Sequence, residues 1–365
     1  MRSNFRVFAV TVFVLFFVGI ALSNSAQGSI TVKDAAGRSV ALAKHPNRLV
    51  CIAPGTLRLV VYLQAQDRVV GIEDMEKRFP TTRPYYMANP QLAKLPSVGP
   101  GGPNAINKEP DYEKILSVNP DIIFISYMEA DVADKVQQKI GIPVFVLSYG
   151  PFGRFSDSVF DSILAAGRVL GTQGRAQVVV DYFSNIRRDL ETRVKGVPEE
   201  EKPSVYIGGI GLRGTQGIES TETDYAPFEW VAAKNIAKQE GKKGHLFVGK
   251  ERLLAIDPDI IFIDGGGNDL VRQDYEKKTA FFAGLSAFQK KEVYTLYPFN
   301  WYMTNLGTVI ADAYAAGKIL YPQRFADIEL TQQADAVYTF LLGCPVYDKL
   351  KQIQGELGQP VAFLK

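Results

Sequence analysis

The sequence predicts an α/β protein built of two lobes with mainly parallel sheets, joined by one long helix. Three observations support this prediction. Strand-like and helical runs alternate on both sides of a central stretch, residues 156–194, that has no strand signal. The hexapeptide PDIIFI occurs twice, with Pro120 and Pro258 lying 138 residues apart. At 365 residues, the chain is also long enough for two domains of ordinary size.

The composition is that of a globular protein, with 46% hydrophobic and 22% charged residues. The net charge of +2 provides no field suited to nucleic acid, so no nucleic-acid partner is expected.

The N-terminal segment, residues 1–28, is predicted to be a secretory signal peptide. Arg2 and Arg6 precede the uncharged run VFAVTVFVLFFVGIAL, and small or polar residues follow, with a small-x-small cleavage site at residues 26–28. The alternative is a retained membrane anchor, because the run is near the short limit for a spanning helix. No cysteine follows the run, which argues against a lipoprotein anchor. We therefore expect an exported protein, periplasmic or otherwise extracytoplasmic.

The two cysteines, Cys51 and Cys344, are too few for a disulfide scaffold in a chain of this size. Cys51 lies in the apolar run RLVCIA and is expected to be a small buried hydrophobe. A bridge to Cys344 remains an open alternative.

The first lobe is predicted to comprise residues 29–155. A hairpin is expected around Ala36 and Gly37, and Thr56 is expected to cap the helix that follows the first buried strand. The expected strands cover residues 48–54, 68–73, 121–127 and 143–149, and the expected helices include residues 111–118 and 131–139.

A helical connector over residues 156–197 follows, with a helix over about 173–194 that spans roughly 30 Å. The second lobe is predicted over residues 198–322, and a helical segment over 323–365 in which Thr331 caps a helix. The elements expected in the second lobe are strands at 204–211, 259–265 and 292–300 and helices at 229–238 and 250–257.

The repeated PDIIFI stretch is interpreted as architecture. In each copy the proline ends a helix, and the apolar strand enters the core. None of the repeated residues needs a chemical role.

Three longer segments resemble the periplasmic binding proteins for iron–siderophore complexes and vitamin B12. They are NRLVCIAPGTLRLVVYLQAQDRVVGIE, EKILSVNPDIIFI and KERLLAIDPDIIFI, which begin at residues 47, 113 and 250. The resemblance extends over about residues 30–340. It implies two Rossmann-like lobes on a rigid helical backbone, a small ligand held between the lobes, and partnership with an ABC permease and its ATPase. A monomer is expected.

In that family, one surface glutamate in each lobe docks on the permease, seven residues before the proline of the helix–proline–strand unit. The matching positions in this sequence are Glu113 and Glu251. Both lie early in a predicted helix, where the helix dipole favours a carboxylate. The alternative is that both are ordinary solvated residues.

Ligands of open α/β sheets bind beyond the carboxyl ends of the strands. The loops at these ends are rich in glycine, aromatic residues and arginine, which suit an anionic organic chelate. Trp301 and Tyr302 could instead be core, and Arg154 and Arg213 could be solvated loop charges. The candidate ligand-binding residues are Thr56, Tyr149, Phe152, Arg154, Arg213, Asn268, Trp301 and Tyr302, of which Tyr149, Arg213 and Tyr302 are ranked first.

The expected ligand is a metal chelate of the iron–siderophore type, and no metal is expected to be bound by the protein itself. With only His45 and His245, the chain cannot build a three-histidine metal site. A corrinoid, haem or a metal oxyanion remains an alternative ligand, and a ligand-sensing subunit remains an alternative role.

An enzyme is disfavoured, because neither a G-x-S-x-G nor an H-E-x-x-H motif is present. The stretch GIGLRG at residues 209–214 fits a dinucleotide fingerprint, but no helix signal follows it directly.

Overall fold

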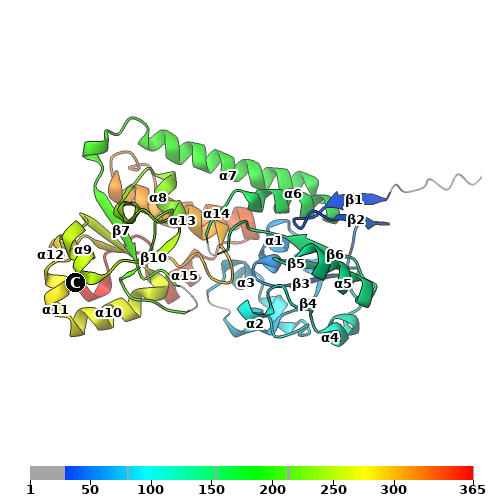
Figure 1. The fold of residues 1–365 in the computed structure, drawn as a ribbon. Coiled ribbons are helices and arrows are strands. Elements are labelled where there is room, and N and C mark those ends of the chain that lie inside the picture. The colour runs from blue at the N-terminus through cyan, green and yellow to red at the C-terminus, as the bar shows by residue number, and fades with distance from the viewer. Residues whose placement is uncertain (1–28, 80–81, 153, 212–213, 365) are drawn as a thin grey trace, which may run out of the picture.

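The computed structural model describes residues 29–79, 82–152, 154–211 and 214–364. The expected signal peptide, residues 1–28, and the candidate ligand residue Arg213 lie outside the described residues. Two α/β lobes lie side by side, and the helix α7 runs along both of them (Figure 1). The predicted fold class is therefore confirmed.

The N-terminal lobe contains a four-stranded parallel sheet in the order β4-β3-β5-β6, and its strands are almost wholly buried. The predicted hairpin is also present, as an antiparallel pair that turns at Gly37 with φ +83°. The strands of the hairpin and sheet are β1 (Ile30–Lys33), β2 (Ser39–Leu42), β3 (Leu49–Ile52), β4 (Val69–Ile72), β5 (Ile122–Ser126) and β6 (Val144–Leu147).

The first helix of this lobe corrects one expectation. Thr56 does not cap it; its hydroxyl donates back to the Ile52 carbonyl (2.8 Å), and Gly55 occupies the cap position with φ +82°. The helices of the lobe are α1 (Thr56–Tyr62), α2 (Asp74–Arg78), α3 (Pro84–Ala88), α4 (Tyr112–Ser117) and α5 (Ala130–Ile140), with 3-10 turns at Gln66–Arg68, Pro90–Lys94 and Pro103–Ala105.

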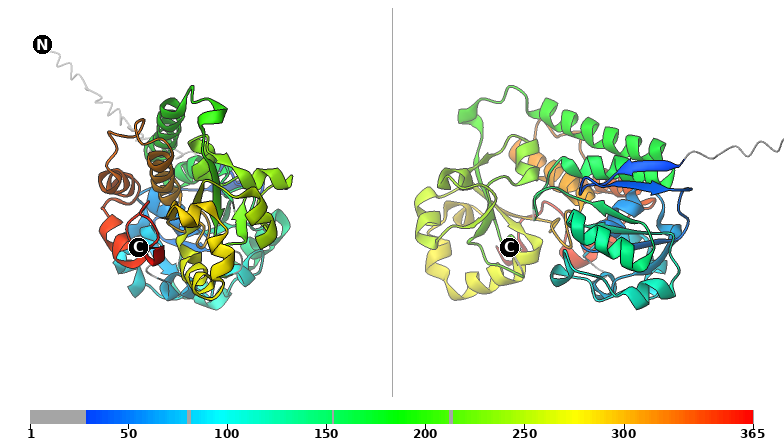
Figure 2. Two further views of the ribbon diagram at one scale, coloured as in Figure 1. Left: turned by 90° about the vertical axis from the view of Figure 1, so that its left-hand side faces the viewer. Right: turned by 45° about the vertical axis from the view of Figure 1, so that its right-hand side comes forward.

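The connector consists of α6 (Ser158–Leu170) and α7 (Gln173–Val194), separated by Gly171 in a left-handed conformation. The expected long helix matches α7. Figure 2 shows that α7 extends from one lobe to the other. The two helices pack closely, because Gly167 of α6 faces Ala176 of α7 without an intervening side chain.

The C-terminal lobe contains a second four-stranded parallel sheet, in the order β12-β11-β7-β9, and a small antiparallel pair, β8 with β10. Its strands are β7 (Ser204–Gly208), β8 (Ser220–Glu222), β9 (Lys234–Asn235), β10 (His245–Phe247), β11 (Ile260–Asp264) and β12 (Val293–Leu296). Its helices are α8 (Ala226–Trp230), α9 (Lys250–Ile256), α10 (Asn268–Lys277), α11 (Thr279–Ala283) and α12 (Ser286–Gln289), with 3-10 turns at Glu199–Glu201, Ile236–Glu240 and Gly265–Gly267.

The helix expected over residues 229–238 is wrong. Helix α8 ends at Trp230, and the chain then adds the edge strand β9 to the sheet. The buried amide of Asn235 donates to the carbonyls of Glu222 and Thr223, and this long-range anchoring outweighs the local helical preference.

The C-terminal helices form a second connection between the lobes. Helix α13 (Leu306–Leu320) packs on α8 of the C-terminal lobe, whereas α14 (Leu330–Leu342) packs on α1 and α3 of the N-terminal lobe. Helix α14 is capped by the Glu329 carboxylate, which accepts from the Gln332 N–H (3.1 Å), and not by Thr331 as expected. The chain ends with α15 (Tyr347–Gln354) and a 3-10 turn at Ala362–Leu364.

The two PDIIFI copies have matching backbone geometry. The residue before each proline is left-handed, with φ +44° at Asn119 and +35° at Asp257, and strands β5 and β11 are buried throughout. The architectural interpretation of the repeat agrees with this burial.

Cys51 and Cys344 are both free thiols, so the alternative of a disulfide is wrong. Within the described residues, none of the helices has the length and hydrophobicity needed to cross a bilayer.

The close packing of α6 on α7 leads to a testable prediction. A Cβ at Gly167 would lie 2.5 Å from the Ala176 Cβ, so Gly167→Ala should lower the free energy of unfolding by ~1–3 kcal/mol. Denaturant titration measures this change. Gly174→Ala is the control, because a Cβ there meets nothing within 4 Å, and its effect should stay within ~1 kcal/mol. Equal effects of the two substitutions would contradict the packing argument.

Candidate functional site

The two lobes meet at the carboxyl ends of their strands, a region that we call the interlobe seam. It comprises Gly55 to Arg58, Glu73 and Tyr149 from the N-terminal lobe and Trp301 to Asn305 from the C-terminal lobe.

Four non-glycine residues in or next to this region have a positive φ. Ala53 follows β3 with φ +69°, Tyr127 follows β5 with φ +56°, and Tyr302 and Met303 have φ +51° and +68°. Non-glycine residues rarely adopt such values, and strained residues of this kind cluster at functional sites.

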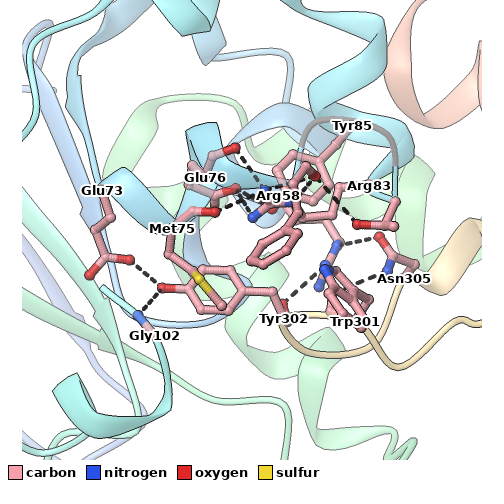
Figure 3. A network of polar contacts seen from close by, with 12 residues as sticks. Arg58, Glu73, Met75, Glu76, Arg83, Tyr85, Gly102, Trp301, Tyr302 and Asn305 are labelled. Carbon is pink, nitrogen blue, oxygen red and sulfur yellow. Dashed lines mark hydrogen bonds and ion pairs between the residues drawn. The ribbon is translucent and has the colours of Figure 1, made fainter. Parts of the chain in front are cut away.

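Arg58 is the central residue of the seam. It is fully buried in α1, and its guanidinium reaches across to the C-terminal lobe (Figure 3). Its Nε donates to Asn305 Oδ1 (3.0 Å), Nη1 donates to Thr304 O (3.0 Å), and Nη2 donates to Trp301 O (3.0 Å) and Tyr302 O (3.1 Å). The remaining Nη1 bond, at 3.3 Å, joins Tyr149 Oη. All five N–H groups are thus satisfied, and every acceptor is neutral.

A second buried arginine shows the opposite arrangement. Arg83 is also fully buried, but its Nη1 pairs with the Glu76 carboxylate (2.8 Å), which also accepts from the Tyr85 hydroxyl (2.7 Å). The charge of Arg83 is therefore balanced within the N-terminal lobe, whereas the charge of Arg58 has no anionic hydrogen-bond partner.

Glu73 and Tyr302 form the second contact across the seam. The Tyr302 hydroxyl donates to Glu73 Oε2 (2.5 Å) and accepts from the Gly102 N–H (3.1 Å), while Glu73 Oε1 accepts from the Ala53 N–H (2.9 Å). Burial raises the pKa of Glu73 to about 7, although the hydrogen bonds from the Ala53 N–H and the Tyr302 hydroxyl act to lower it.

Tyr149 lies inside the N-terminal side of the seam. Its hydroxyl donates to the Gly55 carbonyl (2.8 Å), and its ring lies so close to Gly55 that a Cβ there would be 2.6 Å from the ring. Gly55 is therefore required by this contact as well as by its positive φ.

Aromatic and charged side chains line the edges of the seam. Phe79 meets Trp301 edge to face at 5.5 Å between ring centroids, and exposed Phe152 meets Tyr127 at 5.6 Å. Arg154 reaches across the lobes to pair with Asp224 (2.8 Å), and both side chains are about one-third exposed.

Two buried hydroxyls of this region, Tyr127 Oη and Thr304 Oγ1, lack a hydrogen bond of normal geometry among the described residues, although Tyr127 Oη lies near the backbone of Tyr149. Tyr127 follows β5 next to Tyr149, and Thr304 supplies one of the carbonyls bonded to Arg58. Unsatisfied buried donors are uncommon in folded proteins, so both are candidates for contact with a ligand.

The C-terminal lobe also buries three carboxyl groups around the Tyr225 hydroxyl, which itself lacks a partner among the described residues. Burial raises the pKa of Asp264 to about 7 and of Glu222 to about 8, and it raises that of Asp312 as well. Within the described part of the chain, no group of three or more His, Cys, Asp or Glu side chains is arranged to hold a metal ion.

The predicted ligand residues divide into three groups. Tyr149, Trp301 and Tyr302 meet at the seam with Thr56 beside them, although Tyr149 and Thr56 are fully buried. Phe152 and Arg154 lie at its edges, and Asn268 lies at the start of α10 with a buried Oδ1 that has no partner among the described residues.

The sequence reasoning missed Arg58, Glu73 and Asn305. Arg58 was detectable, because it stands in the apolar helix TLRLVVY, and a charge inside such a run demands a specific partner.

Comparison with known proteins identifies the class. Residues 49–298, more than half of the chain, match the family model described as periplasmic binding protein, and the chain belongs to that family. It is therefore a solute-binding subunit of an ABC importer and not an enzyme.

Two curated relatives cover most of the chain. The molybdate-binding protein MolA of Haemophilus influenzae is 26% identical over 344 residues, which cover 87% of this chain and 92% of the relative. The uncharacterized ABC transporter substrate-binding lipoprotein YvrC of Bacillus subtilis is 25% identical over 274 residues, or 74% and 78% of the two chains.

Solved structures show the same fold. A periplasmic solute binding protein of Veillonella parvula superimposes with a TM-score of 0.71 at 19% identity, covering 90% of this chain and 97% of that one. MolA bound to molybdate gives a TM-score of 0.67 at 21% identity, covering 86% and 98%.

The buried Glu73 carboxyl leads to a prediction for pH dependence. Its pKa is about 7 in the folded protein and near 4.5 in the unfolded chain, so the folded state holds a proton that the unfolded state has lost between these values. Stability should therefore fall as pH rises from 5 to 8, with Asp264 and Glu222 acting in the same direction. In Glu73→Gln, the decrease in the free energy of unfolding between pH 5 and pH 8 should be smaller by up to ~3 kcal/mol.

Unfolding free energies measured at pH 5 and pH 8 test this prediction. Glu109→Gln is the control, because ion pairing lowers the pKa of the exposed Glu109 to about 2 and its titration lies outside this range. Identical pH dependence in Glu73→Gln and the unmodified protein would show that Glu73 is not the titrating group.

Proposed function

We propose that this protein captures a small anionic, metal-containing solute at the interlobe seam and delivers it to an ABC permease and its ATPase. The observation that carries the proposal is Arg58, a fully buried guanidinium whose hydrogen-bond partners are all neutral. A buried cation without an anionic partner is unfavourable by itself and favours a bound anion.

Ligand entry requires an exchange of partners at Arg58. Four of its five hydrogen bonds go to the C-terminal lobe, at Asn305 and at the carbonyls of Trp301, Tyr302 and Thr304. When the lobes separate, these N–H donors become free to bind ligand oxygens, while the bond to Tyr149 stays within the N-terminal lobe. The hydroxyls of Tyr127 and Thr304 supply further neutral donors.

A tetrahedral metal oxyanion is the ligand that this arrangement supports best. The lobes contact each other directly through Arg58, through Tyr302 with Glu73, and through Trp301 with Phe79, which favours a compact ligand. Forked guanidinium donors also match the oxygens of such an anion. The name of the relative MolA, a molybdate-binding protein 26% identical over 344 residues, points to the same class.

An anionic iron chelate of the siderophore type is the second candidate. It is supported by the aromatic side chains at the edges of the seam, Phe79, Trp301 and exposed Phe152, which offer flat apolar surfaces to an organic chelator. Both candidates keep the metal within the ligand, so that the protein need not coordinate it.

The two unpartnered hydroxyls allow a test that leaves the fold intact. Tyr127→Phe and Thr304→Val each remove a hydroxyl without a partner, so neither should lower the thermal midpoint. Each should weaken ligand binding about tenfold, the effect of one lost hydrogen bond to a charged group. Calorimetric titration with sodium molybdate, and separately with a ferric siderophore, measures the affinity.

Thr172→Val is the matched control, because it removes a buried, unpartnered hydroxyl at the junction of α6 and α7, away from the seam. Unchanged affinity in all three variants would contradict a ligand site at the seam. Binding of the siderophore complex but not of molybdate would select the second candidate.

We also propose that Glu113 and Glu251 dock the protein on the permease. Both are exposed in the first turn of their helices, α4 and α9, and neither forms an ion pair with any described residue. Two unpaired carboxylates, one in each lobe, suit electrostatic docking of a transient partner.

The double variant Glu113→Ala, Glu251→Ala should lose at least 90% of its stimulation of the cognate importer's ATPase while its ligand affinity stays unchanged. The control is Glu191→Ala with Glu200→Ala, which removes two other exposed glutamates. The assignment would be overturned if the double glutamate variant lost ligand binding, or if it stimulated the importer's ATPase as fully as the unmodified protein does. Sedimentation of the same samples tests the proposed monomer.

A further inference from the structure

We propose that Leu116 and Leu254 form a matched pair of apolar contacts for the importer's permease, one beside each docking glutamate. The proposal rests on the docking role of Glu113 and Glu251 and extends it to an apolar component. The two leucines occupy equivalent positions of the repeat, three residues after each glutamate and four before each proline.

Both leucines are exposed, although most large hydrophobic side chains of the protein are buried. Leu116 is 50% exposed on α4 and Leu254 is 37% exposed on α9. The preceding residues, Ile115 and Leu253, are fully buried in the cores of their lobes. Each helix therefore has its own anchor to the core. Leu254 also lies against Gly284 of its own lobe, yet more than a third of its surface stays exposed, and half of the surface of Leu116 does.

Residues three apart on a helix lie on the same face, so Glu113 lies next to Leu116 and Glu251 next to Leu254. Both helices thus present a carboxylate and an apolar side chain together. They do so in two different lobes, as Figure 1 shows for α4 and α9.

The local charges keep both carboxylates available. The basic residue after each glutamate has a different partner: Lys114 Nζ pairs with Asp111 (3.2 Å), and Arg252 Nε pairs with Glu240 (2.8 Å). A partner that complements this surface needs two contact sites, one for each helix, and each site needs an apolar depression beside a basic group. The importer's permease, which is the partner proposed for the two glutamates, is large enough to contact helices in both lobes, whereas a small ligand is not.

The test uses the full protein and its cognate permease–ATPase complex in lipid nanodiscs, with association measured by surface plasmon resonance at several salt concentrations. Leu116→Gln and Leu254→Gln should each raise the dissociation constant about tenfold, and the double variant about a hundredfold. The dissociation constant of the double leucine variant should depend on salt concentration in the same way as that of the unmodified protein, because Glu113 and Glu251 remain. Val178→Gln with Ile353→Gln is the control, since these residues are exposed to similar extents, 51% and 45%, on α7 and α15.

The outcomes separate the two proposals. If the leucine variants associate normally while Glu113→Ala with Glu251→Ala fails, the leucine contacts are overturned and glutamate docking stands. If the leucine variants and the glutamate variant both fail while the control associates normally, the inference is supported. Normal association of the glutamate variant would overturn glutamate docking and, with it, the inference that rests on it. A concentration-dependent dimer in sedimentation that disappears in the double leucine variant would identify a second copy of the chain as the partner and would overturn the proposal.

Discussion

The arrangement of the two lobes depends on one side chain, Arg58. Its guanidinium carries a charge that burial alone strongly disfavours, and the cost is offset only because five neutral acceptors converge on it. Four of these acceptors belong to residues 301–305, a segment with two consecutive left-handed residues. The hydrogen bonds from Arg58 therefore stabilise the strained backbone of that segment, and the carbonyls of the segment in turn satisfy the buried guanidinium.

The remaining geometry of the seam is consistent with this central contact. The Tyr302 side chain reaches Glu73 from the same strained segment whose carbonyl faces Arg58. Two helical connections, α7 and the pair α13–α14, hold the lobes at a fixed distance around it. This double connection favours a small change in the separation of the lobes over a wide opening.

The difference between Arg58 and Arg83 is the basis of the anion site that we propose at the seam. Both are fully buried in the same lobe, yet only Arg83 has its own carboxylate, Glu76. The buried acids of the C-terminal lobe do not balance Arg58 either, because burial raises their pKa values and favours their neutral forms near pH 7. In the function that we propose, a negatively charged solute supplies the anionic partner of Arg58.

The sequence by itself determined the two lobes, the helix α7, the strands of both parallel sheets except the edge strand β9, and the repeated turn at Pro120 and Pro258, because hydrophobic periodicity and proline act locally. It also located Tyr149, Trp301 and Tyr302 at strand ends. Only the tertiary structure decided which of these side chains meet. Four of the five partners of Arg58 are separated from it by more than 240 residues, and the edge strand β9 forms only when Asn235 reaches the turn after β8. Such contacts depend on the packing of whole lobes, which no local pattern encodes.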